Sequence, residues 1–157
     1  MSQFVSPAPS PIDVRREFVL VASEFNADYV QGLVTHCTNE LRALSPGSNI
    51  VLHLVPGAFE IPVVVQEFAR QKNAAAIVAL GVILQGETPH AQHLGHVVTH
   101  ALQRISLEHG IPVIHAVLSL QNEEQARKRC LEDEINRGTE AARAAFAMAN
   151  LFAELHQ

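Results

Sequence analysis

The chain has 157 residues, 48% hydrophobic and 17% charged, with a formal net charge of -5 at pH 7. This composition is typical of a globular domain with a sizeable core and excludes a disordered chain. A negative net charge without a Lys/Arg cluster argues against nucleic acid as the main partner. No apolar run is as long as a membrane span. No basic segment followed by an apolar one opens the chain, so we expect no secretory signal.

Two cysteines, Cys37 and Cys130, are too few for a disulfide framework. Both lie in segments with helical spacing, so we expect buried, reduced thiols. A reducing compartment fits this usage, and we therefore expect a cytoplasmic protein.

The first segment, residues 1–13, has prolines at positions 7, 9 and 11. Proline opposes the interior of both helices and sheets. We expect a flexible tail over 1–13, which could still pair with a neighbouring subunit, and a single domain over 14–157.

Within this domain, four apolar runs of strand length alternate with segments of helical spacing. The predicted strands are residues 18–22, 50–55, 74–80 and 111–118. The predicted helices are residues 29–44, 62–70, 88–109, 122–132 and 138–155. Continuous apolar strands are typical of a parallel sheet that helices bury on both faces. The alternation predicts an α/β fold, a three-layer sandwich in which helices flank a four-stranded parallel sheet.

A polar loop follows each predicted strand, at residues 23–26, 56–60, 81–90 and 119–122. Open α/β proteins bind ligands at the carboxyl edge of the sheet, where such loops meet. The loops bring an aromatic and an amide in Phe25 and Asn26, a carboxylate in Glu60 and an imidazole in His90.

The loop 81–90 carries a carboxylate, a hydroxyl and an imidazole in Glu87, Thr88 and His90. Thr88 before Pro89 can cap a helix, and free N–H groups at a helix start suit a phosphate. No dinucleotide fingerprint or P-loop pattern occurs, which argues against a dinucleotide or a nucleoside triphosphate. These residues predict a small polar ligand with an anionic end. The alternative is a polar surface loop with a capping threonine and an exposed histidine.

Three segments resemble the lumazine synthase (6,7-dimethyl-8-ribityllumazine synthase) family. They are residues 55–62 (VPGAFEIP), 86–90 (GETPH) and 148–151 (MANL). Residues 25–26 and 125–129 match shorter motifs of the family, and the resemblance extends over about residues 15–155.

The resemblance implies condensation of 5-amino-6-(ribitylamino)uracil with 3,4-dihydroxy-2-butanone 4-phosphate. The products are 6,7-dimethyl-8-ribityllumazine, phosphate and water, in riboflavin biosynthesis. It also implies a flavodoxin-like fold and no metal or organic cofactor. The expected partners are the small-molecule substrates and further copies of the chain, in a pentamer or a multiple of pentamers. Each active site is expected to lie between neighbouring subunits.

The resemblance also assigns roles to individual residues. His90 would carry protons, because an imidazole titrates near neutral pH and serves as both acid and base. Thr88 and the backbone near Gly86 and Glu87 would hold the phosphate, together with Arg129 of the neighbouring subunit.

Further residues would contact the other substrate. Glu60 would accept hydrogen bonds from ribityl hydroxyls, and Phe25 would cover one face of the pyrimidine beside Asn26. The remaining pocket positions are Ala58, Phe59, Ile83 and His115. Taken alone, Glu60 reads as a helix-start carboxylate, Phe25 as a core aromatic and Arg129 as a solvated helix residue.

The chain also departs from the family pattern. Glu24 and Gln85 stand where the family often has arginine, and His115 stands where it commonly has a stacking aromatic. An acidic segment, residues 131–137, replaces a loop rich in glycine and lysine. We therefore predict weaker substrate binding than is usual in the family, without loss of function, and a lone pentamer rather than a sixty-subunit cage.

Three histidines, His93, His96 and His100, share one face of the predicted helix 88–109. Their spacing is compatible with metal ligands, and the resemblance places this helix around a central channel. We hypothesise adventitious metal or anion binding there, against the alternative of a solvated lining. Two other functions stay open: a riboflavin synthase-like activity and a non-catalytic flavin-binding shell protein.

Overall fold

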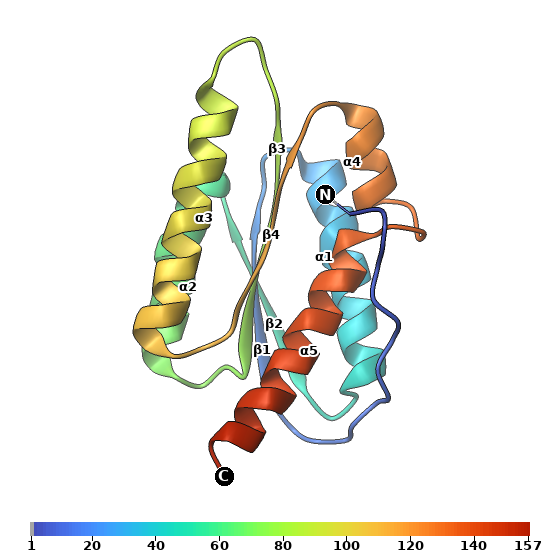
Figure 1. Cartoon of the computed structure of the whole chain (residues 1–157), viewed down its shortest axis with the longest axis vertical. Coiled ribbons are helices and arrows are strands. Elements are labelled where there is room, and N and C mark those ends of the chain that lie inside the picture. Colours follow the sequence, from blue (N-terminus) through green and yellow to red (C-terminus); the bar gives the residue numbers. More distant parts are fainter. Residues whose placement is uncertain (1) are drawn as a thin grey trace.

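The computed structural model describes residues 2–157 (Figure 1). The strands are β1 (Glu17–Ser23), β2 (Asn49–Val55), β3 (Ala76–Leu84) and β4 (Val113–Leu120). The helices are α1 (Ala27–Leu44), α2 (Ile61–Gln71), α3 (His90–His109), α4 (Glu123–Cys130) and α5 (Arg137–Leu155), and a short 3-10 helix, η1, spans Ala58–Glu60. The predicted order of strands and helices is confirmed.

The four strands form one parallel sheet in the order β2-β1-β3-β4. Helices α2 and α3 cover one face of the sheet, and α1, α4 and α5 lie on the other (Figure 1). The predicted α/β three-layer sandwich with a four-stranded parallel sheet is therefore confirmed. Its strand order is that of the flavodoxin-like sheets, which bind ligands where the order reverses, between β1 and β3.

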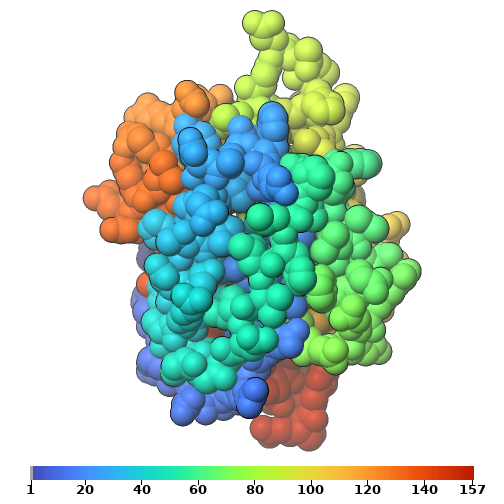
Figure 2. Space-filling view, turned by 180° about the vertical axis from the view of Figure 1, so that it is seen from behind, coloured from blue at the N-terminus to red at the C-terminus, as the bar shows by residue number. Residues whose placement is uncertain are grey.

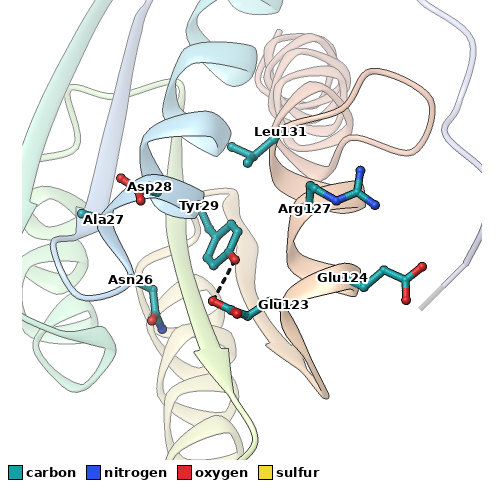
Figure 3. Close-up of a pocket in the computed structure, with 8 residues that line it drawn as sticks. All are labelled: Asn26, Ala27, Asp28, Tyr29, Glu123, Glu124, Arg127 and Leu131. Carbon is teal, nitrogen blue, oxygen red and sulfur yellow. Dashed lines mark hydrogen bonds between the residues drawn. The ribbon is translucent and has the colours of Figure 1, made fainter.

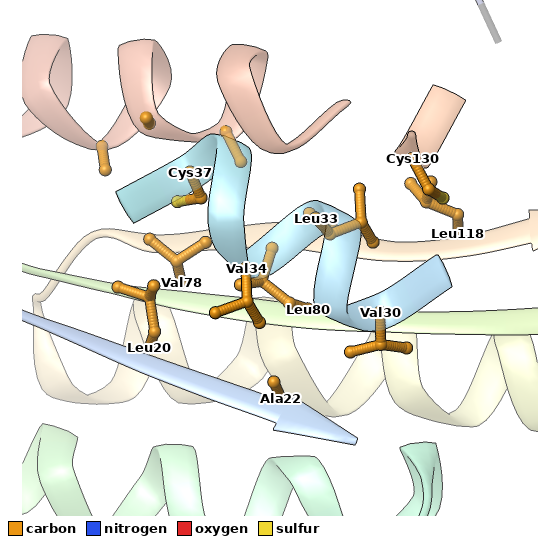
Figure 4. Close-up of a cluster of buried hydrophobic side chains, with 14 of the residues drawn as sticks. Leu20, Ala22, Val30, Leu33, Val34, Cys37, Val78, Leu80, Leu118 and Cys130 are labelled. Atoms are coloured by element: carbon orange, nitrogen blue, oxygen red, sulfur yellow. The ribbon is translucent and has the colours of Figure 1, made fainter. Parts of the chain in front are cut away.

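Alternate residues of the central strands feed two separate hydrophobic cores. In β1, Leu20 faces the core under α1 and α5, whereas Val21 faces the core under α2 and α3. Figure 4 shows the first core, in which Val34 and Cys37 of α1 lie over the sheet. Because both faces of each central strand are buried, the sequence reads as a continuous apolar run rather than an alternating one.

Both cysteines are buried and unpaired, as predicted. Burial raises the pKa of Cys37 and the pKa of Cys130 to about 12. A low-dielectric surrounding disfavours the thiolate, so both groups stay protonated at neutral pH.

The predicted ends of the third and fourth strands are wrong. β3 continues to Leu84 and β4 to Leu120, so residues 81–84 and 119–120 are strand rather than loop. Gly81 misled the prediction because glycine usually marks a turn. A Cβ at Gly81 would lie 3.0 Å from Ser23 Oγ and 3.3 Å from a Val117 methyl carbon. This glycine therefore permits close packing inside the sheet, and the loop is only residues 85–89.

Helix α3 begins at His90, two residues later than predicted. The His90 N–H reaches Thr88 Oγ1 at 3.5 Å, which is too long for a strong cap. The predicted stop is confirmed, because Gly110 follows the helix with a φ of 62°.

The N-terminal segment lies along α5. Arg137 donates hydrogen bonds to the carbonyls of Ser2 and Phe4, and Arg143 donates to the carbonyl of Ser6. The Ile12 N–H also donates to the carbonyl of Leu44 at 2.9 Å. The flexibility of residues 1–13 stays a prediction, and Met1 lies outside the described residues. Among residues 2–157, no helix is both long enough and apolar enough to cross a bilayer.

Candidate active site

A cavity of about 310 Å³ opens at the carboxyl edge of the sheet. Seven of the predicted site residues line it: Phe25, Asn26, Ala58, Phe59, Glu60, Ile83 and His90. They come from the ends of β1 and β3, from η1 and from the first turn of α3. Three of the four loops that the sequence predicted to meet at one edge therefore line one cavity, and the fourth, residues 119–122, does not.

Asn26 joins two of these elements. Its backbone is left-handed, with φ 59° and ψ 46°, a conformation that asparagine tolerates better than most residues. Its Nδ2 donates a hydrogen bond of 2.7 Å to the carbonyl of Val82 in β3. This turn leaves Phe25 71% exposed at the cavity. The alternative of a core aromatic at Phe25 is therefore wrong.

Glu60 ends η1 and precedes α2, as a helix-start carboxylate would. Its side chain does not cap the helix, and it makes no hydrogen bond or ion pair with residues 2–157. A half-buried carboxylate without an internal partner is available to accept hydrogen bonds from a ligand.

His90 is exposed at the start of α3, and its side chain lines the same cavity. Ile83 is 6% exposed and Ala91 is 7% exposed, so the wall beside the imidazole is apolar. An imidazole, a carboxylate and an amide around an apolar hollow suit a small ligand with an apolar ring and polar substituents.

The predicted phosphate site behaves differently. Gly86, Glu87 and Thr88 are all exposed and do not line the cavity. Loop 85–89 belongs to the yellow-green segment that stands above the body of the molecule in Figure 2. A Cβ at Gly86 would meet no atom within 4 Å, so the loop is open on the side of this glycine.

Two predicted residues lie away from the cavity. His115 is in the middle of β4, opposite Ala79, and Arg129 is in α4. Arg129 is only 7% exposed, so the alternative of a solvated helix residue is wrong. Its buried Nε has no hydrogen-bond partner, and no carboxylate among residues 2–157 pairs with it. A buried cation without a partner is costly, and an anionic ligand would offset that cost.

A larger cavity, about 710 Å³, lies on the other side of Asn26 between α1 and α4 (Figure 3). Asp28, Glu123 and Glu124 line it. The Tyr29 hydroxyl donates to Glu123 at 3.1 Å. Burial is the larger cause, and this hydrogen bond the second, of a raised pKa of the Tyr29 phenol. These three carboxylates outnumber the one cationic side chain of the lining, Arg127, so the cavity disfavours an anionic ligand and the smaller cavity is the better candidate site.

The structure adds apolar residues that the sequence did not single out. The cavity is also lined by Gly57, Val82, Leu84, Ala91 and Leu94. Ala91 and Leu94 follow helical spacing and could have been found as the inner face of α3. Val82 and Leu84 were hidden because the strand was predicted to end at Leu80.

Among residues 2–157, no group of three or more His, Cys, Asp and Glu side chains is arranged to hold a metal ion. The metal hypothesis for His93, His96 and His100 thus has no support within one chain. A ring formed by several copies stays a prediction.

The fold and the cavity together define an open α/β protein that binds a small polar ligand at the carboxyl edge of its sheet. The model of the 6,7-dimethyl-8-ribityllumazine synthase family matches residues 15–153. This match covers most of the chain, and the chain belongs to this family, which is a family of transferases in riboflavin biosynthesis.

Curated relatives agree with this assignment. A 6,7-dimethyl-8-ribityllumazine synthase of Leptothrix cholodnii is 40% identical over 137 residues, covering 87% of this chain and 86% of the relative. One from Paraburkholderia phymatum is 40% identical over 139 residues, covering 88% and 78%. One from Azoarcus sp. is 38% identical over 133 residues, covering 84% and 83%. The resemblance inferred from the sequence is confirmed.

Proposed function

We propose that this chain condenses 5-amino-6-(ribitylamino)uracil with 3,4-dihydroxy-2-butanone 4-phosphate to give 6,7-dimethyl-8-ribityllumazine, phosphate and water. The observation that carries this proposal is the convergence of seven predicted residues on one cavity. Family membership and the printed names of the relatives support the same reaction.

The residues of the cavity suit the pyrimidine substrate. The exposed ring of Phe25 covers one face of the pyrimidine, and the carboxylate of Glu60 accepts hydrogen bonds from ribityl hydroxyls. His90 moves protons during imine formation, phosphate elimination and ring closure, since an imidazole can both take up and release a proton near neutral pH. Holding the two substrates in contact contributes up to roughly 7–11 kcal/mol to lowering the barrier.

The phosphate of the second substrate requires cationic and N–H donors. The backbone and hydroxyl of residues 86–88 supply part of this set, and Arg129 of a neighbouring subunit supplies the charge. The buried Nε of Arg129, which has no hydrogen-bond partner among residues 2–157, supports this role. In one chain Arg129 does not line the cavity, so we propose that the complete site forms between two copies.

We propose a homopentamer, or a multiple of pentamers, as the active assembly, located in the cytoplasm. Exposed apolar side chains support contacts between copies: Leu52 and Leu54 on the edge strand β2 are 41% and 57% exposed. Apolar groups on an open edge are typical of a surface that another chain covers. The two free, buried cysteines support the reducing compartment.

The acidic segment 131–137 bears on affinity. Glu132 pairs with Arg127, and Asp133 lies 3.1 Å from His36 Nε2. These exposed pairs compensate only part of the negative charge, since surface ion pairs are weak. We therefore retain the proposal of weak, salt-sensitive binding of the butanone phosphate and of a lone pentamer. Tight binding that salt does not change would contradict it.

One assay tests the reaction. The protein is incubated with both substrates while phosphate release and lumazine absorbance are followed. Equal amounts of phosphate and lumazine support the proposal. Riboflavin formed from lumazine alone would instead indicate a riboflavin synthase-like activity, and tight flavin binding without turnover would indicate a shell protein.

A mixing experiment tests whether the site is shared. His90→Ala and Arg129→Ala subunits are unfolded together and refolded in equal amounts. If each site takes His90 from one subunit and Arg129 from the next, about a quarter of the sites recover both residues. Recovery to no more than the residual activity of the two variants would show that both residues serve the same subunit's site.

A further inference from the structure

A second cavity, of about 390 Å³, lies at the amino edge of the sheet, opposite the candidate active site. It is bounded by the residues just before β1, β3 and β4, by the ends of α2 and α3, and by the last turns of α5. These segments meet at the lower end of Figure 1. No residue lines both cavities, and the volume is typical of a small-molecule site.

The apolar wall of this cavity is one face of α5. Residues 149, 152, 153 and 156 line it, at the three- and four-residue spacing that places side chains on one helix face. Earlier in α5 the same face packs on the sheet through Ala142 and Ala145. The last turns of α5 extend beyond the strands, so Phe152 has no strand beneath it and is only half-buried (Figure 1). The cavity therefore leaves part of an apolar helix face uncovered.

The polar side chains of the cavity are cations and imidazoles. They belong to Arg16, Lys72, His109 and His156, and none of the described residues that line the cavity is Asp or Glu. Neither Arg16 nor Lys72 forms an ion pair with a carboxylate of residues 2–157. The chain has 16 acidic and 11 basic residues, so a cavity with two cations and no carboxylate is unusual in it and favours an anion.

Arg16 is held in place by the chain. It is half-buried immediately before β1, and its Nη1 donates a hydrogen bond of 2.5 Å to Asn150 Oδ1 on α5. This bond restricts the guanidinium, while the other N–H groups of the side chain make no hydrogen bond with residues 2–157. A planar guanidinium with free N–H groups is suited to a carboxylate or a phosphate.

Lys72 has an unfavourable backbone conformation at the same cavity. It follows α2 with φ 56° and ψ 24°, a left-handed conformation that a Cβ makes costly. Gly110 follows α3 with φ 62°, and glycine is the usual residue at such a helix end. At the first of these two similar positions the chain has a lysine, which is less stable there but brings a cation to the cavity.

The helix ends offer a competing explanation for part of this charge. The helices α2, α3 and α5 all end at the cavity, and their free carbonyls attract cations such as Lys72 without any ligand. That explanation does not extend to Arg16, which precedes a strand, or to the uncovered face of α5. The carbonyls also reduce the positive potential, so the cavity suits a ligand with one anionic group rather than a polyanion.

We propose that this cavity is a second binding site, for a small organic anion with one phosphate or carboxylate group and a flat apolar body. The anionic group lies between Arg16 and Lys72, and the apolar body lies against Phe152 and Ile111. The site uses no residue of the proposed condensation, so either proposal can fail without the other.

Calorimetry with three probes tests the class of ligand. Phenyl phosphate has both an anionic group and a ring, inorganic phosphate has only the anion, and phenol has only the ring. We expect phenyl phosphate to bind at least about tenfold more tightly than either of the others, because it alone contacts both the cations and the apolar wall. Inorganic phosphate that binds as tightly would overturn the proposed class, and phenyl phosphate that does not bind at millimolar concentration would overturn the site.

Two variants test the cations. Arg16→Gln removes the charge but keeps a side-chain N–H for Asn150, and it should weaken phenyl phosphate binding about tenfold or more. Arg15→Gln, at the exposed neighbouring position outside the cavity, is the matched control and should bind as the wild type does. Lys72→Gly removes the other cation together with the left-handed strain, so it should weaken binding while raising the urea midpoint. Unchanged affinity in both cavity variants would overturn the proposal.

Two further variants test the ring contact and the location. Phe152→Leu keeps an apolar side chain without a ring, and it should weaken binding of phenyl phosphate but not of inorganic phosphate. Phenyl phosphate can also enter the proposed active site, so Arg129→Ala is compared with Arg16→Gln. Affinity that falls only in Arg16→Gln supports the second site. Affinity that falls only in Arg129→Ala would assign the binding to the proposed active site and overturn the proposal.

Discussion

The predicted site residues form two groups, and the chain holds the two groups in different ways. Around the cavity, Phe25 is 71% exposed, and the side chains of Glu60 and His90 make no hydrogen bond or ion pair with residues 2–157. The second group consists of His115, which is bonded at both ring nitrogens, and Arg129, which is only 7% exposed. The first group comes from loops and element ends, whereas the second comes from the middle of β4 and the last turn of α4.

This difference indicates that the two groups of residues meet the ligand in different ways. Groups on loop ends can adjust to a ligand that enters their own cavity, whereas groups fixed in β4 and α4 must be oriented before they meet it. The second group lines no part of the cavity of its own chain, so its orientation is useful only to another copy. The following experiments test this interpretation, from the largest expected effect to the smallest.

Removing the imidazole of the cavity group should have the largest effect. General acid–base catalysis contributes about 10²- to 10⁴-fold, so His90→Ala should lower kcat by about that factor. Some rate should remain because the substrates are still held together. His93→Ala, three residues further along α3 and outside the cavity, is the matched control and should keep the wild-type kcat. Equal losses in the two variants would contradict a specific role for His90.

Removing the cation of the second group should have the next largest effect. Hydrogen bonds to charged groups contribute about 1.5–3 kcal/mol, so Arg129→Ala should lower kcat/KM for the phosphorylated substrate about 100-fold. Arg127→Ala is the control, since Arg127 is half exposed and pairs with Glu132. The kinetics are measured at low and high salt. An Arg129→Ala enzyme that retains wild-type kcat/KM would remove Arg129 from the site.

Two glycines near the carboxyl edge of the sheet, Gly81 and Gly86, compare a tightly packed part of the site with an open one. Gly81→Ala places a Cβ 3.0 Å from Ser23 Oγ, and overpacking of this kind costs about 1–3 kcal/mol of stability. Gly86→Ala meets nothing within 4 Å and should change the stability of the chain little. Urea unfolding of the two variants measures both effects. Similar midpoints would mean that the end of β3 is not tightly packed.

The smallest effect concerns pH. The folded chain holds the pKa of His115 below its ordinary value of 6.5, mainly through burial. Below pH 6.5 the unfolded chain takes up a proton at His115 before the folded chain does. The contribution of His115 to stability is therefore complete above pH 6.5 and is lost as the pH falls from there through the folded pKa. Urea midpoints at several pH values should fall less steeply in His115→Phe than in the wild type.

The sequence predicted the fold and the first group of residues, those around the cavity, well. Strands buried on both faces are continuous apolar runs, and the loops after them share one edge in any parallel sheet. Phe25, Glu60 and His90 each stand next to a strand or helix boundary, so their convergence followed from the order of elements. The predicted end of β3 was wrong because Gly81 permits close packing inside the sheet and does not form a turn.

The second group could not be placed from the sequence alone. His115 lies within a strand and Arg129 within a helix, where local pattern says only whether a side chain is buried. The bond between Thr99 and His115 joins two elements and depends on how α3 packs on β4. The resemblance to a family supplied the roles of His115 and Arg129, but it gave no sign that Thr99 holds the ring.

The two buried cysteines have a practical consequence for following the open loop. Both thiols are buried and their pKa is raised to about 12, so at pH 7 they stay protonated and the folded chain should resist maleimide reagents. A single cysteine introduced at Glu87 would then be the one site to take up a fluorophore, without removal of Cys37 or Cys130. Its emission would report when loop 85–89 leaves water, either on assembly of the copies or on arrival of a phosphate.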